Sequence, residues 1–288
     1  MAYEITTNPL TGVEAHPGSG HYAVYDHGAH VWAWQPDGQR PVLWMSAQSM
    51  FVSGQPIRGG VPVIFPWFGM GQGGDKKPAH GFVRLHEWNR TRVVDTLGSD
   101  GKLIVEYAID PSRTGHPEDW PSSYAATLTV EFTPTYLQVG MEVSNGSTHP
   151  FTFEQALHTY LAVSDVRNVT VTGLEGADYL DKVAGRSDFD TTQDGPVTIT
   201  AETDRVYRYP GTVILHDPGW QRKLEISKEG SADLVVWNPW TAKSAAMPDF
   251  GDDEWPSMIC IEAVNALDDA VHLPPGSSAV MSQRITLA

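Results

Sequence analysis

Hydrophobic and polar residues alternate with a period of two along most of this chain, and this pattern constrains the fold more than any other feature. Leu128, Val130 and Phe132 alternate with threonine and glutamate, and residues 137–143 repeat the pattern. Further short runs of strand character occupy residues 103–109, 169–174, 197–200, 213–216, 234–237 and 258–264. Because successive side chains of a strand point to opposite faces, we expect a strand at each of these places.

The breaks between the runs carry turn-forming residues, as at Asn145-Gly146, Asp217-Pro218-Gly219 and Pro274-Pro275-Gly276. No stretch of twelve residues has an apolar period of 3.6, and at most one helical turn is expected near residues 242–247. Many short strands with almost no helix predict an all-β sandwich or barrel. Since no linker, repeat or low-complexity tract interrupts the series, we expect one domain over residues 1–288.

Charge and cysteine content exclude several classes of protein. The 288 residues include 19 basic and 35 acidic side chains, a net charge of −16, so no extended nucleic-acid surface is expected. An anionic substrate would be repelled at long range, so any phosphate recognition must be local. Cys260 has no second cysteine to pair with, and neither a secretory signal nor a membrane-spanning run is evident. We expect a cytoplasmic protein without membrane contact.

Residues 58–84 hold two arginines and a histidine among many glycines, prolines and aromatics. Gly59 and Gly60 let the backbone approach another group closely, and Trp67 and Phe68 supply flat apolar surface. Such a segment suits a sugar ring, and its arginines offer a bidentate fork to a phosphate or carboxylate. The alternative is a glycine-rich hairpin whose arginines form surface ion pairs.

His158 and Glu262 are the candidate acid–base residues. In the run 151–163, alternation places Glu154, His158 and Tyr160 on the face opposite three apolar side chains. A lone histidine there is more often a half-buried strand residue satisfied by its neighbours. Glu262 lies in the apolar run 258–264, where burial should raise its pKa above about 4.3. Its alternative role is an ion pair with a structural arginine.

Six short motifs extend this interpretation along the chain. They are Arg58-Gly-Gly-Val-Pro62, Phe65-Pro-Trp-Phe-Gly69, His80-Gly-Phe-Val-Arg84, Ala156-Leu-His-Thr-Tyr160, Thr203-Asp-Arg-Val-Tyr207 and Cys260-Ile-Glu-Ala263. In this order they resemble the hexose-6-phosphate 1-epimerase family, which is related to aldose 1-epimerase and has the galactose mutarotase fold. The resemblance implies a large antiparallel β-sandwich, in agreement with the strand pattern.

The resemblance also assigns catalytic roles. It implies that His158 is the general acid that protonates the ring oxygen of the sugar, and that Glu262 is the general base that deprotonates the anomeric hydroxyl. Opening a hemiacetal needs these two proton transfers and no covalent intermediate, metal or cofactor. A well-placed acid or base contributes on the order of 10²- to 10⁴-fold in rate.

Four further residues match substrate-contacting positions of the family. The resemblance implies that Arg58 and Arg84 bind phosphate and that Asp204 accepts hydrogen bonds from sugar hydroxyls. His80 either contacts ring hydroxyls or organises its loop. Some relatives carry glutamine where this chain has Ala79, so one substrate contact is absent or is supplied elsewhere.

Other conspicuous residues favour structural roles. His80 and His86 have no cysteine or carboxylate at metal-binding spacing, so we expect no metal site. The acidic residues of segment 249–254 lack the spacing of a calcium loop and are expected to be solvated. Cys260 is expected to be a small buried apolar side chain. Trp237-Asn-Pro-Trp240 could flank a sugar cleft or close a strand corner.

Together these features predict an isomerase that interconverts the α and β anomers of a hexose 6-phosphate, with glucose 6-phosphate as the first candidate. The protein would be a monomer whose partner is a small-molecule sugar phosphate. One alternative keeps the chemistry but acts on free aldoses, which would leave the two arginines unexplained. The other is a non-catalytic carbohydrate-binding sandwich, which would need aromatic platforms but no buried histidine and glutamate.

Overall fold

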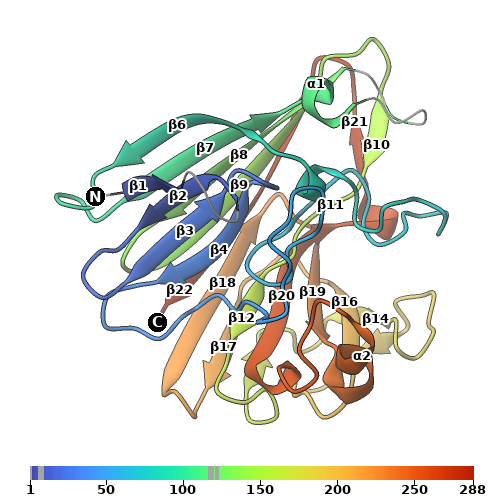
Figure 1. Ribbon diagram of the computed structural model, residues 1–288. Coiled ribbons are helices and arrows are strands. Elements are labelled where there is room, and N and C mark those ends of the chain that lie inside the picture. Colours follow the sequence, from blue (N-terminus) through green and yellow to red (C-terminus); the bar gives the residue numbers. More distant parts are fainter. Residues whose placement is uncertain (1, 6–9, 116–119, 121–122) are drawn as a thin grey trace.

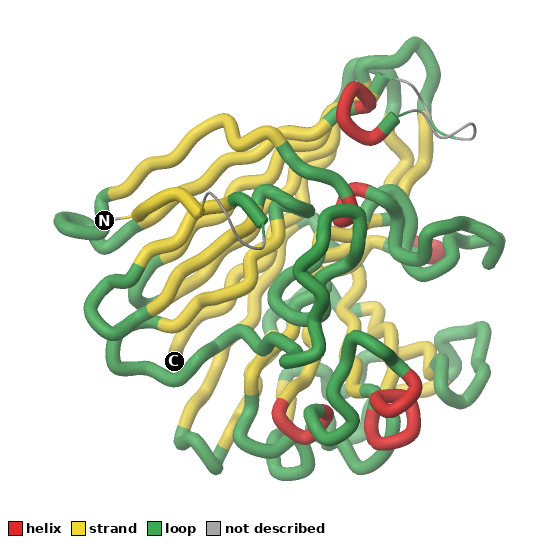
Figure 2. Tube along the Cα trace, viewed as in Figure 1, coloured by secondary structure: helices red, strands yellow, loops and turns green. Residues whose placement is uncertain are grey.

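The computed structural model describes residues 2–5, 10–115, 120 and 123–288, and it shows two eight-stranded sheets with two smaller ones (Figures 1 and 2). All pairings between the strands are antiparallel. The predicted all-β antiparallel sandwich is therefore confirmed. The longest described helix has seven residues, and no helix in the described ranges is long and apolar enough to span a membrane.

The first large sheet, here called the outer sheet, follows the predicted alternation closely. Its strand order is β13-β17-β18-β22-β9-β8-β7-β6. The bounds are β6 Asn89–Asp95, β7 Leu103–Ile109, β8 Tyr124–Phe132, β9 Tyr136–Asn145, β13 Thr170–Thr172, β17 Val213–Asp217, β18 Arg222–Glu229 and β22 Ser278–Leu287. In β8, Leu128, Val130 and Phe132 are buried while Thr127 and Thr129 are exposed, so one face of this sheet faces the core.

The second large sheet, here called the site sheet, is buried more completely. Its order is β15-β14-β16-β19-β20-β11-β5, and β12 also pairs with β20. The bounds are β5 Val63–Ile64, β11 Gln155–Leu157, β12 Tyr160–Ala162, β14 Asp178–Asp181, β15 Thr191–Thr192, β16 Thr203–Arg208, β19 Asp233–Asn238 and β20 Met258–Asn265. All eight residues of β20 are buried, which explains why all of them except Glu262 and Asn265 are apolar.

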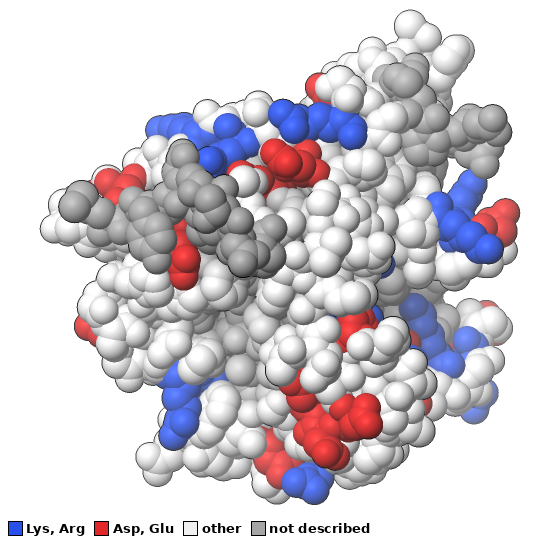
Figure 3. Space-filling view, viewed as in Figure 1, with Lys and Arg blue, Asp and Glu red and all other residues white. Residues whose placement is uncertain are grey.

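Smaller elements complete the fold. A four-stranded sheet contains β1 Ala2–Ile5, β2 Gly12–Ala15, β3 His21–Tyr25 and β4 His30–Gln35, and β10 Phe151–Phe153 pairs with β21 Val271–Leu273. The helical segments are α1 Pro111–Thr114, α2 Trp240–Ala246, η1 Val83–Leu85, η2 Trp255–Ser257 and η3 Leu267–Asp269. The face in Figure 3 shows acidic and basic groups in separate small patches, without a continuous basic stripe.

One hydrophobic core cluster includes buried side chains of both large sheets. Gln283 of β22 also connects the two sheets, since its amide nitrogen donates to the carbonyl of Ile261 in β20 and its amide oxygen accepts from Thr159. Gln283 is 2% exposed, so this buried polar link fixes how the outer sheet packs on the site sheet.

Three local predictions were wrong. Residues 197–200 form no strand, because only Val197 makes an isolated bridge, to Val171. The run 151–163 is not one alternating strand but β10, β11 and β12, separated at Glu154 and at residues 158–159, because β10 pairs with β21 whereas β11 and β12 pair with separate stretches of β20. The helix near residues 242–247 is α2, which is nearly two turns long rather than one.

Candidate active site

One cavity of about 380 Å³ brings together all six residues that the sequence singled out for catalysis and substrate binding. They are Arg58, His80, Arg84, His158, Asp204 and Glu262, and they come from the site sheet and from the loops that cover it. Size does not distinguish this cavity, because a hollow of about 570 Å³ near Asn168 and another of about 420 Å³ near Trp67 lie elsewhere. What distinguishes it is the set of ionisable groups in its wall.

His158 and Glu262 face each other from neighbouring strands. Glu262 lies in the middle of β20, and His158 directly follows β11, which pairs with β20 through Leu157 and Ala263. The distance from His158 Nε2 to Glu262 Oε1 is 3.4 Å, and Glu262 is 1% exposed. His158 Nδ1 and Glu262 Oε2 have no hydrogen-bond partner in any other described residue. The expected alternatives, a satisfied histidine and a glutamate paired with arginine, are both wrong for the described residues.

Burial shifts the two groups toward their neutral forms. It raises the pKa of Glu262 well above its usual value, and Asp204 raises it further while Lys182 opposes the shift. Burial also lowers the pKa of His158 to about 3, assisted by the positive charges of Arg58 and Arg84. The two shifts favour a proton on Glu262 over a proton on His158.

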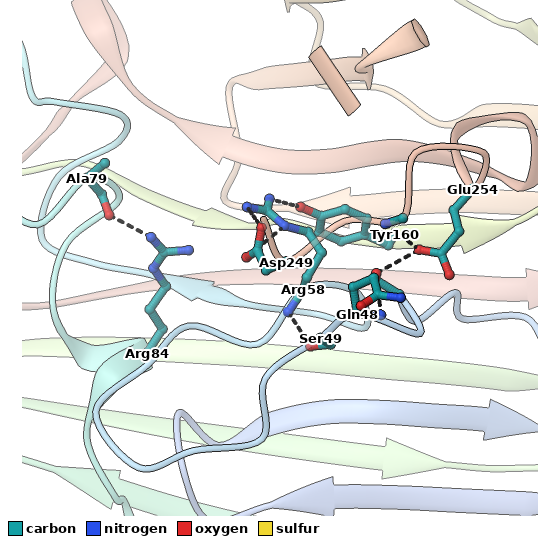
Figure 4. A network of polar contacts seen from close by, with 10 residues as sticks. Gln48, Ser49, Arg58, Ala79, Arg84, Tyr160, Asp249 and Glu254 are labelled. Carbon is teal, nitrogen blue, oxygen red and sulfur yellow. Dashed lines mark hydrogen bonds and ion pairs between the residues drawn. The ribbon is translucent and has the colours of Figure 1, made fainter. Parts of the chain in front are cut away.

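Arg58 is held by a fixed set of partners (Figure 4). Its Nε and Nη2 donate to the two carboxylate oxygens of Asp249 at 3.2 and 3.1 Å, and its Nη1 donates to the Tyr160 hydroxyl at 2.9 Å. A guanidinium has five N–H groups, so two remain for a ligand. The ring of Tyr160 also stacks on His158, with centroids 4.8 Å apart, and so links Arg58 to the proposed acid.

Arg84 has fewer hydrogen-bond partners than Arg58 among the described residues. Its Nη2 donates to the carbonyl of Ala79 at 2.7 Å, while its buried Nε has no partner among the described residues. Burial lowers its pKa to about 10, so the side chain stays charged near neutral pH. A charged donor with unused N–H groups in a cavity wall is suited to an anion.

Asp204 and Lys182 also line the cavity. Asp204 lies in β16, and burial raises its pKa, although Lys182 and Lys243 oppose this. The backbone N–H of Lys182 donates to the carbonyl of Asp204 at 2.9 Å, and its ammonium lies 4.5 Å from the ring centroid of Phe68. Sequence reasoning missed Lys182, because nothing in the turn after β14 marks it as part of a site.

His80 helps to organise its loop, and its contact with ring hydroxyls stays a prediction. It lines the cavity, where its ring packs edge-on against His158 at 5.7 Å, and its Nδ1 accepts a hydrogen bond from the backbone of Gly69. Gly60 has a more structural role than expected. With φ at +60°, an added Cβ would lie 2.2 Å from the carbonyl oxygen of Val31, so this glycine lets two protein segments meet and leaves no gap for a ligand.

The acidic segment 249–254 is not solvated throughout, so that prediction was wrong. Asp249 is buried against Arg58, and Glu254 accepts hydrogen bonds from the Ser46 hydroxyl at 2.6 Å and the Ala47 N–H at 2.8 Å. These carboxylates attach the segment after α2 to the loop that carries Arg58.

The two tryptophans near β19 have different places. Trp237 lines the cavity, whereas Trp240 packs on Trp255 with ring centroids 4.1 Å apart. Trp237 thus supports the cleft interpretation of this motif and Trp240 the structural one.

Cys260 is buried, as expected, and its thiol lies near the pair His158 and Glu262.

Comparison with known proteins agrees with this architecture. The family model for aldose 1-epimerase matches residues 14–286. A protein of Cenchrus ciliaris named "Putative glucose-6-phosphate 1-epimerase" is 34% identical over 88% of this chain and 77% of its own length. A protein of Escherichia coli K12 with the same name is 35% identical over 83% of this chain and 78% of its own length.

Among solved structures, a "putative mutarotase" from Salmonella typhimurium superposes with a TM-score of 0.88. It is 27% identical, and the match covers 100% of this chain and 93% of the other. The fold and the acid–base cavity therefore define a β-sandwich protein of the mutarotase class. More particularly, the chain belongs to the aldose 1-epimerase family.

Proposed function

We propose that this protein is an isomerase that interconverts the α and β anomers of a hexose 6-phosphate, with glucose 6-phosphate as the first substrate to test. The observation that carries the proposal is one cavity in which a histidine–glutamate pair lies beside two arginines. The pair supplies acid–base chemistry, and the arginines supply a reason for a phosphate. The names of the relatives point to the same substrate.

Ring opening requires two proton transfers around one carbon atom. Glu262 as carboxylate takes the proton from the anomeric hydroxyl, while His158 as imidazolium gives a proton to the ring oxygen and the C1–O5 bond breaks. Both oxygens are bonded to C1, so acid and base must lie close together, as the 3.4 Å contact allows. Rotation about C1–C2 presents the other face of the aldehyde, and closure reverses both transfers.

The number of protons on Glu262 and His158 together stays the same through this cycle. Before opening, the pair is Glu262 carboxylate and His158 imidazolium; afterwards it is a neutral carboxyl and a neutral imidazole. Both states hold one proton. Burial favours the neutral state, since it raises the pKa of Glu262 and lowers that of His158. The cavity therefore stabilises the protonation state of the open-chain intermediate.

Phosphate binding is assigned to Arg58 and Arg84. Both residues line the cavity and have N–H groups to spare, and charge-assisted hydrogen bonds contribute about 1.5–3 kcal/mol each. Because the chain has a net charge of −16, such a local cluster is the means by which an anion is held. Asp204 accepts from sugar hydroxyls, His80 contacts the ring, and Lys182 adds a third cation to the wall.

Exchange NMR on glucose 6-phosphate tests the proposal. The protein should accelerate exchange between the two anomeric proton signals, and Glu262→Gln should abolish the acceleration. Free glucose is the matched substrate, because it has the same ring and no phosphate. Equal acceleration of both sugars would favour the free-aldose alternative, and binding without any acceleration would favour a carbohydrate-binding sandwich.

We also propose that residues 1–288 act as one catalytic domain and that the protein is a monomer. The support is that one core cluster includes both large sheets and that the cavity draws residues from positions 58 to 262 of one chain. Light scattering after size exclusion should give a mass near 31.6 kDa.

A further inference from the structure

Two clusters of side chains in the described residues place three metal-binding atoms within 4.8 Å of one another. The first, the hairpin cluster, contains Glu14, His16 and His21 of the β2–β3 hairpin. The second, the cavity cluster, contains His158, Cys260 and Glu262. No function described above uses Cys260, although its thiol is buried beside the proposed acid and base.

The spacing of the donor atoms separates the two clusters. In the hairpin cluster, Glu14 Oε1 lies 3.3 Å from His16 Nε2, but it also forms an ordinary hydrogen bond of 2.6 Å with His21 Nε2, which is shorter than the separation of two ligands of one ion. The rings of His16 and His21 are stacked at 4.7 Å with an interplanar angle of 18°, so their in-plane lone pairs run side by side and do not meet.

The cavity cluster differs in this respect. His158 Nε2 and Glu262 Oε1 are 3.4 Å apart, beyond the usual N–H···O range of about 2.7–3.2 Å. Two ligands of a tetrahedral zinc ion, each bonded at 2.0–2.1 Å, lie about 3.3 Å apart. This pair is therefore spaced as two ligands of one ion would be.

We propose that His158, Cys260 and Glu262 form an inhibitory binding site for a thiophilic divalent cation such as Zn²⁺. Cys260 and Glu262 are two residues apart on β20, so their side chains project from the same face of the strand. Nitrogen, thiolate and carboxylate donors are the set that Zn²⁺ binds. Three protein ligands leave a fourth position, which opens into the cavity because His158 and Glu262 line it.

The surroundings indicate an inhibitor and not a resident metal. A histidine that holds a permanent zinc ion almost always donates its other ring N–H to a partner, which fixes the ring. His158 Nδ1 has no such partner in any other described residue. Arg58, Arg84 and Lys182 also line the cavity and oppose a cation there. The ion is thus held by its three ligands alone.

Binding involves no redox step. The Cys260 thiol loses its proton to solvent as the sulfur–metal bond forms, and any proton on Glu262 leaves in the same way. The ion is then bonded to His158 and Glu262 at the atoms that would exchange protons with the sugar, so catalysis stops. The inhibition rests on the proposed function, whereas the binding itself does not.

Cobalt(II) spectroscopy tests the site without an assay of activity. Purified protein carrying His16→Ala and His21→Ala, which remove the hairpin cluster, should bind one Co²⁺ per chain with a thiolate-to-cobalt charge-transfer band in the near ultraviolet. Cys260→Ser in the same background should lose this band. Competition with a chromophoric chelator should show that Zn²⁺ binding weakens at least tenfold in Cys260→Ser. Absence of the band, or unchanged Zn²⁺ affinity in Cys260→Ser, would overturn the proposal.

A second variant covers the case in which Cys260→Ser does not fold, as judged by circular dichroism. Glu262→Gln keeps the thiol and the shape of the side chain, and should also weaken Zn²⁺ at least tenfold. An unchanged affinity in Glu262→Gln would equally overturn the site.

Inhibition of anomerisation provides the second readout. Zn²⁺ should compete with glucose 6-phosphate, and its inhibition constant should rise at least tenfold in Cys260→Ser, measured against that variant's own uninhibited rate. A cobalt–thiolate band in a protein with no anomerase activity would contradict the proposed function and leave the site standing. Anomerase activity without the band would support the proposed function and contradict the metal site.

Discussion

The two ends of the cavity differ in how their side chains are held. The chemical end contains His158 and Glu262, and the anion end contains Arg58 and Arg84. At the chemical end, Glu262 projects from the fully buried strand β20 and His158 directly follows β11, and each has a polar atom without a partner among the described residues. At the anion end, Arg58 projects from a loop, and its ion pair with Asp249 and hydrogen bond to Tyr160 hold it in place. At the chemical end, strand pairing holds the backbone in place, while polar side-chain atoms lack hydrogen-bond partners among the described residues. At the anion end, contacts made by the side chains hold a loop in place.

This difference separates two requirements. Proton transfer needs groups whose pKa values are displaced and whose polar atoms are free, and a buried sheet provides both. Anion binding needs fixed charges with spare donors, and a loop can supply them if carboxylates hold it. Removing a group from the chemical end should therefore affect the rate of the reaction, while removing one from the anion end should affect substrate discrimination.

The largest effect is expected for Glu262→Gln. Glutamine keeps the shape but cannot take the proton, so kcat for glucose 6-phosphate should fall by about 10²- to 10⁴-fold with little change in binding. Because Glu262 Oε2 is buried and has no partner within the described part of the chain, thermal stability should not fall. Exchange NMR and a thermal melt measure the two quantities on one sample.

Glu154→Gln is the matched control for this prediction. Glu154 is also buried, but it accepts hydrogen bonds from the backbone of Phe68 and Leu267, and it does not line the site cavity. Its replacement should lower stability by about 1–3 kcal/mol and leave most of kcat. If both variants lost activity equally, the loss in Glu262→Gln would reflect the removal of a buried carboxylate and not the removal of a catalytic base.

The sequence predicted the chemical end better than the anion end, for a physical reason. A carboxylate inside an apolar strand is anomalous by its neighbours alone, so Glu262 is conspicuous in residues 258–264. The partner of Arg58 is 191 positions away, and no local pattern connects them. Composition suggested that segment 249–254 is solvated, whereas tertiary contacts bury Asp249.

The same reasoning explains the successes and failures in the fold. Alternation predicted β8 and β9 because one face of the outer sheet is exposed. In residues 151–163 both faces are buried, so period two carried no information about where the strands break. Lys182 was missed because its place in the site follows from the pairing of β14 with β16, which the sequence does not show.

Arg84→Ala tests the anion end. Loss of its charged donors should weaken kcat/KM for glucose 6-phosphate by about 10- to 100-fold, with the change mainly in KM. Any activity on free glucose should scarcely change, because glucose has no phosphate for Arg84 to bind. Arg113→Ala, an exposed arginine on α1, is the charge-matched control. Equal losses on both sugars would mean that Arg84 supports the fold and does not select the substrate.

The pH dependence of stability distinguishes the two members of the proton-sharing pair. Burial raises the pKa of Glu262 and lowers the pKa of His158, so folding favours a proton on the glutamate and disfavours one on the histidine. The two shifts contribute slopes of opposite sign to the unfolding free energy as a function of pH, so in the parent protein they oppose each other.

Single variants should reveal opposite slopes. In Glu262→Gln only His158 remains; its folded pKa is lowered, so its contribution is lost as pH falls, and the unfolding free energy should rise with pH by about 1.4 kcal/mol per pH unit relative to the parent. In His158→Asn only Glu262 remains; its folded pKa is raised, so its contribution is lost as pH rises and the unfolding free energy should fall with pH. Urea unfolding at pH 4.5, 5.5 and 6.5 measures both. Slopes of the same sign would show that the two groups do not share a proton.

The smallest effect, and the sharpest test of the comparison, is expected for Asp249→Asn. Asp249 touches no substrate in this scheme and acts as a positioning residue, since it fixes two N–H groups of Arg58. Asparagine offers one acceptor oxygen and no charge, so Arg58 should lose its fixed orientation but stay in the cavity. KM for glucose 6-phosphate should rise by roughly three- to tenfold, in keeping with the loss of about 1 kcal/mol of hydrogen bonding, while kcat and the activity on glucose stay the same.

Asp253→Asn removes the same charge from the same segment at an exposed position and should change neither constant. The split between KM and kcat is decisive because Tyr160 connects Arg58 to His158. If Asp249→Asn lowered kcat on both sugars, the orientation of Arg58 would be transmitted through Tyr160 to the acid. The two ends of the cavity would then work as one unit, and the division between a chemical end and an anion end would fail.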